Sequence, residues 1–196
     1  MSRSRSYGGV ALSSKRILRY LPENEMQVRV LDVGCGYDAR LLRSVLHENM
    51  LADCIDVSIS DVVKQLDSVH AFEGTIEDTI STLDTDCYDY VLLISVLEHL
   101  VDPQYVLNEI YRVLKPGGTL LLNVPTWNGK IALEASAFRL RTGETAFYEM
   151  NDHKMYYNKH DLWPMLVKAG FLPSNIHLSY YKFTLNLFAK CSRHEN

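Results

Sequence analysis

Two aspartates and a glycine turn have the types and spacing needed to hold a small polar ligand. Asp32 directly precedes the turn Gly34-Cys35-Gly36, and Asp56 lies 20 residues beyond Gly36. Glycine adopts positive φ and leaves room for a ligand beside the backbone. The helix expected next offers unpaired N–H groups and partial positive charge. We therefore expect the N–H groups of the turn to face a ligand, with a carboxylate or phosphate as the natural guest.

Two ligand classes fit this pattern. Residues 34–39 match the G-x-G-x-x-G/A fingerprint of dinucleotide-binding proteins, which alone is a weak match. Asp32 favours S-adenosylmethionine (SAM), because its carboxylate can hold an ammonium group, directly or through water, and would repel a pyrophosphate. Asp56 can accept hydrogen bonds from ribose hydroxyls, which both ligands carry, or it can simply cap a turn before Ser58. Asp56 therefore supports the site without choosing the ligand.

The elements that must position these residues alternate between strand and helix. Apolar runs predict strands at about 28–33, 52–57, 69–72, 89–95 and 119–124, and helical patterns fall at about 39–48, 60–67 and 103–114. This alternation predicts a doubly wound α/β sheet with right-handed crossovers. Ligands bind at the carboxyl ends of the strands in such a sheet. Val57, Thr75, Ile76 and Ser95 join the candidate site because they too fall at the carboxyl ends of predicted strands.

The length and composition are those of one ordinary domain covering residues 1–196. We expect residues 1–10 to form a flexible leader without a secretory signal. Ser13 or Ser14 can cap a short helix that ends before Pro22 and exposes Lys15, Arg16 and Arg19 as a solvated face. We predict that residues 126–160, rich in aromatic side chains, form a lid over the substrate pocket and are helical at about 130–141.

Charge and cysteine content limit the partners and the compartment. The net charge of −4 gives no overall attraction to nucleic acid, and no apolar run is long enough to cross a membrane. The four cysteines form no C-x-x-C pair and no metal-ligand spacing. We expect reduced cysteines in a cytoplasmic protein, and no nucleophilic role for Cys35.

Residues 89–125 carry a block that identifies a family. The segments Leu-Glu-His-Leu and Arg-Val-Leu-Lys-Pro-Gly-Gly and the closing Val-Pro follow the D-V-G-C-G turn at characteristic distances. Together they resemble class I SAM-dependent methyltransferases, of the group related to the ubiquinone-biosynthesis O-methyltransferases. The resemblance covers about 28–125 and touches 160–171. It implies a Rossmann-like sheet of seven strands with an antiparallel last strand; Ile176–Tyr180 and Lys182–Lys190 would be strands six and seven, joined through Tyr181.

The resemblance also implies a cofactor site and shows three departures. SAM would be held by residues distributed along the first four strand ends: Asp32, Gly34, Cys35, Gly36, Asp56, Val57, Thr75, Ile76 and Ser95. Position 38 is Asp where many relatives have Gly, and Thr75 replaces an acid that reads the adenine. Some relatives bind a divalent cation with Glu-x-x-Glu-His, of which only Glu98 and His99 remain. We therefore expect no metal, although two of the three ligands are present.

A hydroxyl acceptor would benefit from a general base. His99 and His153 are the candidates, since histidine titrates near neutral pH. His99 follows the fourth strand, and its alternative role is capping or packing. His153 lies beside Asp152, and its alternative role is that of a surface residue. The acceptor itself, and the oligomeric state, do not follow from the sequence.

The leading hypothesis is methyl transfer to a hydroxyl of a small molecule, such as a metabolite, a quinone precursor or a lipid-linked sugar. A methyltransferase acting on nucleic acid or protein is a second hypothesis; the chain lacks a basic patch and an Asn/Asp-Pro-Pro-Tyr segment. An NAD(P)-dependent oxidoreductase is a third, and it lacks a Tyr-x-x-x-Lys pattern. A SAM-binding module without catalysis is a fourth.

Overall fold

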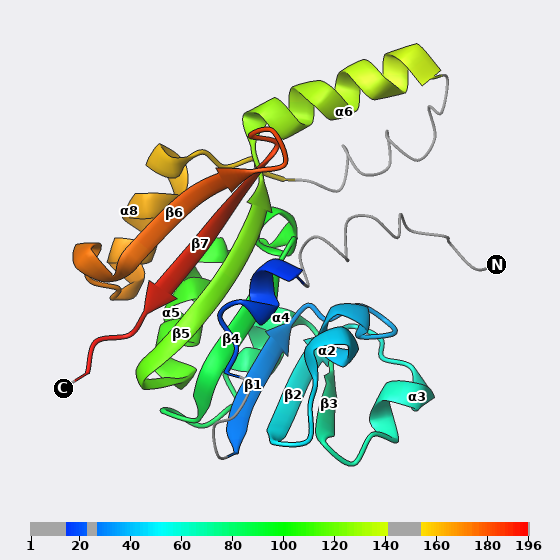
Figure 1. Ribbon diagram of the computed structural model, residues 1–196, viewed down its shortest axis with the longest axis vertical. Coiled ribbons are helices and arrows are strands. Elements are labelled where there is room, and N and C mark those ends of the chain that lie inside the picture. Colours follow the sequence, from blue (N-terminus) through cyan, green and yellow to red (C-terminus); the bar gives the residue numbers. More distant parts are fainter. Residues whose placement is uncertain (1–14, 23–26, 141–153, 196) are drawn as a thin grey trace.

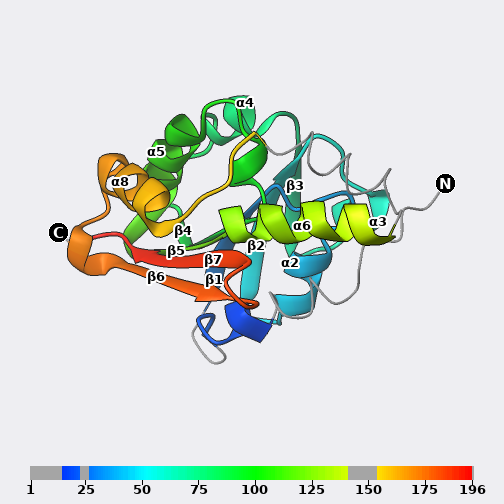
Figure 2. The same cartoon turned by 90° about the horizontal axis from the view of Figure 1, so that it is seen from above.

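The computed structural model describes residues 15–22, 27–140 and 154–195, which form a seven-stranded sheet with helices on both faces (Figures 1 and 2). The strands are β1 (Val28–Val33), β2 (Met50–Asp56), β3 (Val69–Glu73), β4 (Tyr88–Ile94), β5 (Leu114–Pro125), β6 (Ile176–Tyr181) and β7 (Asn186–Ser192). Their order is β3-β2-β1-β4-β5-β7-β6, and β7 alone among these strands runs opposite to the others, antiparallel to β5 and β6. The predicted Rossmann-like fold with an antiparallel last strand is confirmed.

The helices divide between the two faces of the sheet. They are α2 (Arg40–Val45), α3 (Asp61–Lys64), α4 (Ile76–Ile80), α5 (Pro103–Val113), α6 (Trp127–Leu140) and α8 (Lys159–Ala169), with 3-10 turns η1 (Leu97–His99) and η2 (Pro173–Asn175). Residues 15–18 are also helical. Figure 2 shows α4, α5 and α8 on one face and α2 on the other. Each face has its own buried core, and consecutive residues of β4, Leu92 and Leu93, enter opposite cores.

Local sequence signals explain where several elements begin. Asp102 caps α5, since its side chain accepts a hydrogen bond from the Tyr105 N–H at 2.9 Å, and Pro103 occupies the first turn as predicted. The fifth strand, however, begins at Leu114 and not at Thr119. Leu114 already pairs with Tyr88, and the register shifts before pairing resumes further along β5. The predicted helix stop at 115–118 is therefore an irregularity inside a strand.

The last hairpin differs from the prediction in its turn. Strand β6 extends to Tyr181 and β7 starts only at Asn186, because Lys182, Phe183 and Thr184 all adopt positive φ. Thr126 fastens this turn, donating from Oγ1 to the Thr184 carbonyl at 2.6 Å.

Helix α6 starts beside the hairpin turn and extends above the carboxyl edge of the sheet (Figures 1 and 2). The predicted helix near 130–141 is confirmed as α6, whereas residues 141–153 of the expected lid lie outside the described residues. No helix in the described ranges is both long and apolar enough to cross a membrane.

Candidate active site

The carboxyl ends of β1 to β4 bring the sequence-predicted residues to one edge. The glycine turn follows β1, Asp56 ends β2, Thr75 follows β3 and Ser95 follows β4. Strand β1 pairs with both β2 and β4, so the turn lies centrally, between Asp56 and Ser95. This is the edge at which ligands bind in doubly wound sheets.

The glycine turn is closed on one side and open on the other. Gly34 and Gly36 have φ of +75° and +74°. A Cβ on Gly34 would lie 2.4 Å from Cγ2 of Val96, so the segment that follows β4 packs directly against the turn. A Cβ on Gly36 would have no atom within 4 Å. The open space at Gly36 is therefore where a ligand has access to the backbone.

The expectation that the N–H groups of the turn face a ligand is wrong. The N–H groups of Gly34 and Cys35 donate to the Ile55 carbonyl at 2.8 and 3.1 Å. The Gly36 N–H donates to Oδ2 of Asp56 at 2.6 Å. The chain thus uses these three donors to join β1 to β2. A pyrophosphate, which binds such a turn through free N–H groups, finds none of the three available.

Asp32 is a buried carboxyl group that has no counter-charge among the described residues. It is 2% exposed, and Oδ2 has no hydrogen-bond partner within the described chain. Burial, and secondarily the negative charge of Asp56, raise the pKa of Asp32 to about 7. A buried acid of this kind suits a cationic group, whose charge would stabilise the ionised carboxylate.

The neighbouring Cys35 lies where its thiolate is disfavoured. A hydrogen bond with Cys54, burial, and the charge of Asp32 all raise the pKa of the Cys35 thiol. A reactive cysteine needs the opposite environment, in which the thiolate is stabilised. All four cysteines are free, as expected from the sequence.

Residues at the ends of β2 and β3 form an exposed rim. Asp56 is half-buried, and its bond from Gly36 engages only Oδ2, which leaves Oδ1 available. Val57 is 72% exposed. Thr75 caps α4 by accepting from the Asp78 N–H at 3.3 Å, and Ile76 starts that helix.

A polar network behind Ser95 was missed by the sequence reasoning. Asn123, 2% exposed on β5, donates from Nδ2 to Oγ of Ser95 at 3.1 Å. Tyr181 donates its hydroxyl proton to Oδ1 of Asn123 at 2.8 Å. Ser95 itself has φ of +57°. A polar residue interrupting the apolar run of β5 was the available signal.

Of the two candidate bases, only His99 lies within the described residues. It ends η1 and is half-buried, with its N–H donating to the Val96 carbonyl at 2.9 Å. His153 lies outside the described ranges. The described part of the chain contains no group of three or more His, Cys, Asp or Glu side chains that could hold a metal ion.

Glu98, next to His99, is the second buried acid at this edge. It is 1% exposed, and its Oε2 has no partner in the described part of the chain. Burial raises the pKa of Glu98 to about 8, so the group is largely protonated at pH 7. Its carbonyl accepts from the Lys154 N–H at 2.8 Å, which joins η1 to the segment that leads into α8.

A cavity of about 520 Å³ lies elsewhere, on the flank where α8 meets β6. Its lining includes Trp163, Pro164 and Leu178. None of the sequence-predicted site residues lines it. The convergence of polar groups at the strand ends, and not this cavity, therefore marks the candidate active site.

Comparison with known proteins decides the family. A family model described as a methyltransferase domain matches residues 6–177. The chain belongs to this methyltransferase family. The assignment to class I SAM-dependent methyltransferases made from the sequence is thereby confirmed.

Individual relatives agree with the family. The chain is 32% identical over 115 residues to a ubiquinone biosynthesis O-methyltransferase of Salmonella newport, an alignment that covers 55% of this chain and 46% of the relative. The chain thus aligns with about half the length of such relatives.

Solved structures show the same methyltransferase fold. A SAM-dependent methyltransferase from Archaeoglobus fulgidus superposes with a TM-score of 0.68 at 16% identity, covering 94% of each chain. A methyltransferase from Haloferax volcanii, solved in complex with the activator Trm112, gives 0.67 at 15% identity, covering 96% of this chain and 95% of that one.

Proposed function

We propose that this methyltransferase binds SAM at the carboxyl edge of β1, β2 and β4 and transfers its methyl group to a hydroxyl oxygen of a small molecule. The observation that carries the proposal is the buried Asp32 without a counter-charge, beside a glycine turn whose N–H groups are already used. That combination suits a cofactor with an ammonium group and disfavours one with a pyrophosphate. The O-methyltransferase relative supports oxygen as the accepting atom.

The residues present fit SAM without rearrangement of the turn. Asp32 would hold the ammonium group, and the free Oδ1 of Asp56 would accept from the ribose hydroxyls. Val57 would offer an exposed apolar surface for the adenine. The backbone N–H of Ile76, at the start of α4, would be a second contact for it. Gly36 leaves the backbone open to the ligand. Thr75 is engaged in capping α4 and would contribute through its position, not through its hydroxyl.

Bound SAM supplies an activated methyl group on a sulfonium, so the protein mainly aligns the acceptor oxygen with it. The chain must also receive the proton that the acceptor hydroxyl loses. His99, at the end of η1, would serve as this base, and His153 is the second candidate from the sequence. We propose that residues 126–160, through α6, close over the acceptor and exclude water. We further propose a cytoplasmic location, supported by the four reduced cysteines.

Calorimetric titration with SAM, S-adenosylhomocysteine and NAD tests the proposal. We expect micromolar binding of the first two and none of NAD. Asp56→Ala should weaken binding by about tenfold or more through loss of charge-assisted hydrogen bonds. The control is Asp84→Ala, an exposed aspartate that precedes β4 at the opposite edge. Binding of NAD alone, or equal losses in both variants, would refute the proposed cofactor site.

A further inference from the structure

The sequence suggested that Arg16 lies on a solvated face, but in the structure it packs against the last hairpin. Its guanidinium carbon lies 4.4 Å from the ring centroid of Phe188 and 4.8 Å from that of Tyr181. Nη2 donates to the hydroxyl of Ser179 on β6. These contacts fix a long cationic side chain against the last hairpin, where cation–π attraction holds it.

The charge of Arg16 is not balanced by a carboxylate. The described residues give Arg16 no ion pair, and its Nε is enclosed without an acceptor. A second cation, Lys182, places Nζ 5.3 Å from the centroid of the same Tyr181 ring. Burial lowers the pKa of Lys182, with no acid acting against that effect. Among the described residues neither cation has a carboxylate partner, which is costly for partly buried charges, and an anion that contacted them would relieve that cost.

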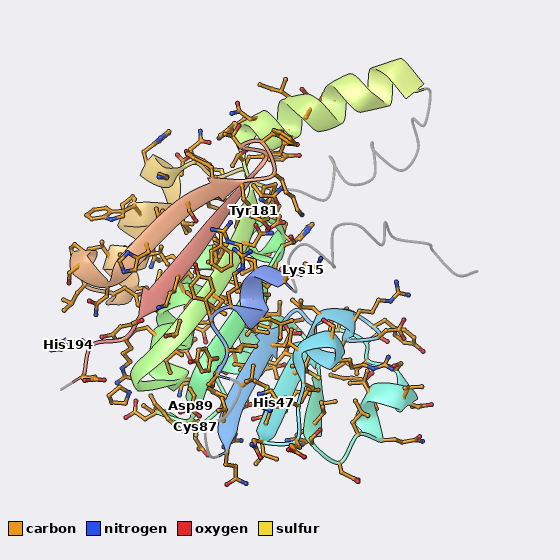
Figure 3. All side chains as sticks on the ribbon, viewed as in Figure 1. Lys15, His47, Cys87, Asp89, Tyr181 and His194 are labelled. Carbon is orange, nitrogen blue, oxygen red and sulfur yellow. The ribbon has the colours of Figure 1, made fainter. Side chains whose placement is uncertain are left out.

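This cluster is connected to the methyl-transfer edge by direct contacts. The Tyr181 hydroxyl binds Asn123, and Asn123 binds Ser95. Ser95 precedes Val96, which packs against Gly34 of the cofactor turn. The cations therefore lie on the β5–β7 flank of the carboxyl edge, beyond the proposed SAM site. Figure 3 labels Tyr181 and Lys15, the neighbour of Arg16, in this part of the molecule, and Asp89 at the opposite edge.

We propose that Arg16 and Lys182 bind an anionic group, a carboxylate or a phosphate, carried by the methyl acceptor. This inference rests on the proposed methyl transfer and adds the acceptor class to it. Arg16 suits the role because its planar guanidinium binds such oxygens in a fixed geometry. Binding the anion here would orient the acceptor so that its hydroxyl is directed toward Ser95 and the methyl donor.

The test follows the arginine Nε–H signals of the ¹⁵N-labelled full chain, loaded with S-adenosylhomocysteine, by nuclear magnetic resonance. Its probes are 4-hydroxybenzoate, the uncharged 4-hydroxybenzamide, and inorganic phosphate. The Arg16 Nε is enclosed, so its proton should exchange slowly enough to be seen. We expect one of the two anions to shift the Arg16 signal saturably, and the benzamide to bind about tenfold more weakly than the benzoate if the carboxylate is the group recognised.

Variants separate the site from the fold. Arg16→Gln and Lys182→Gln should each weaken anion binding about tenfold and leave the affinity for S-adenosylhomocysteine unchanged. Arg19→Gln is the matched control, since Arg19 is exposed in the turn that directly follows the helical residues 15–18. A response to phosphate alone identifies a phosphorylated acceptor, and one to benzoate alone identifies a carboxylate. If S-adenosylhomocysteine binds and neither anion shifts the Arg16 signal, the proposed anion site is refuted and Arg16 only stabilises the fold. If S-adenosylhomocysteine does not bind, the proposed function itself is refuted.

Discussion

Glu98→Gln should make the protein less sensitive to rising pH. Glu98 is buried with an unpartnered oxygen, and its pKa rises from 4.5 to about 8 in the folded chain. Below pH 4.5 the group is protonated in both states. Between 4.5 and 8 only the folded state holds the proton, so the free energy of unfolding falls as pH rises. Above 8 the group is ionised in both states and the loss is complete.

The interval from 4.5 to about 8 corresponds to a loss of up to about 5 kcal/mol. Glutamine keeps the shape and removes the proton equilibrium. The ratio of the unfolding equilibrium constants of wild type and variant should therefore change about tenfold per pH unit between pH 4.5 and about 8. Above about pH 8 the ratio should level off. Any constant cost of placing the amide leaves this slope unchanged.

Urea denaturation at pH 5, 6, 7, 8 and 9 measures this difference. Other titrating groups act on both proteins alike and cancel in the subtraction. Glu48→Gln, the same change at an exposed carboxylate, should give a difference that stays flat with pH. A flat difference for Glu98→Gln as well would show that the carboxyl is hydrated in solution, and would refute the argument from burial.

Further predictions concern the cofactor turn and the C-terminal strand. Since Asp32 has a pKa of about 7, binding of S-adenosylhomocysteine at pH 6 should release close to one proton, which calorimetry in buffers of different ionisation enthalpy detects; Asp32→Asn should release none. Gly34→Ala should cost about 2 to 4 kcal/mol of stability, because its Cβ meets Val96 at positive φ. Gly36→Ala should cost about 1 to 2 kcal/mol and weaken cofactor binding more than it weakens the fold; equal stability losses in the two glycine variants would contradict the geometry. Arg193→Ala should lower the unfolding free energy by about 2 to 3 kcal/mol, since the side chain donates to several main-chain carbonyls between 111 and 114; a change below 0.5 kcal/mol in urea titration would count against that role.

The sequence predicted the sheet well because the relevant signals are local. The continuous apolar run of β4 is what a strand covered on both faces requires, and Asp102 with Pro103 carries its own capping information. The start of β5 was predicted too late. Gly117-Gly118 indicated the end of a helix, whereas Leu114, before these glycines, already pairs with Tyr88. The three positive-φ residues of the last turn are not glycines, so their residue types did not indicate this backbone conformation.

The candidate site was predicted in position more successfully than in detail. Strand ends fixed where Asp32, Asp56 and Ser95 lie, because parallel strands share one carboxyl edge. Which N–H groups are used within the protein depends on the register of β1 against β2, which pattern alone does not give. The environment of Arg16 depends on contacts with residues more than 160 positions away, which no local window contains.

The position of β7 between β5 and β6 has a consequence for how the molecule is assembled during synthesis. The elements that surround the cofactor turn are all complete once β4 has left the ribosome, whereas Phe188, on which Arg16 rests, belongs to the last strand. A chain grows from its N-terminus, and its parts fold as they emerge. The cofactor half of the edge can therefore form first, and the cationic half is finished only when β7 inserts beside β5. If Arg16 and Lys182 bind the acceptor as proposed, the acceptor site is completed later in synthesis than the elements around the glycine turn.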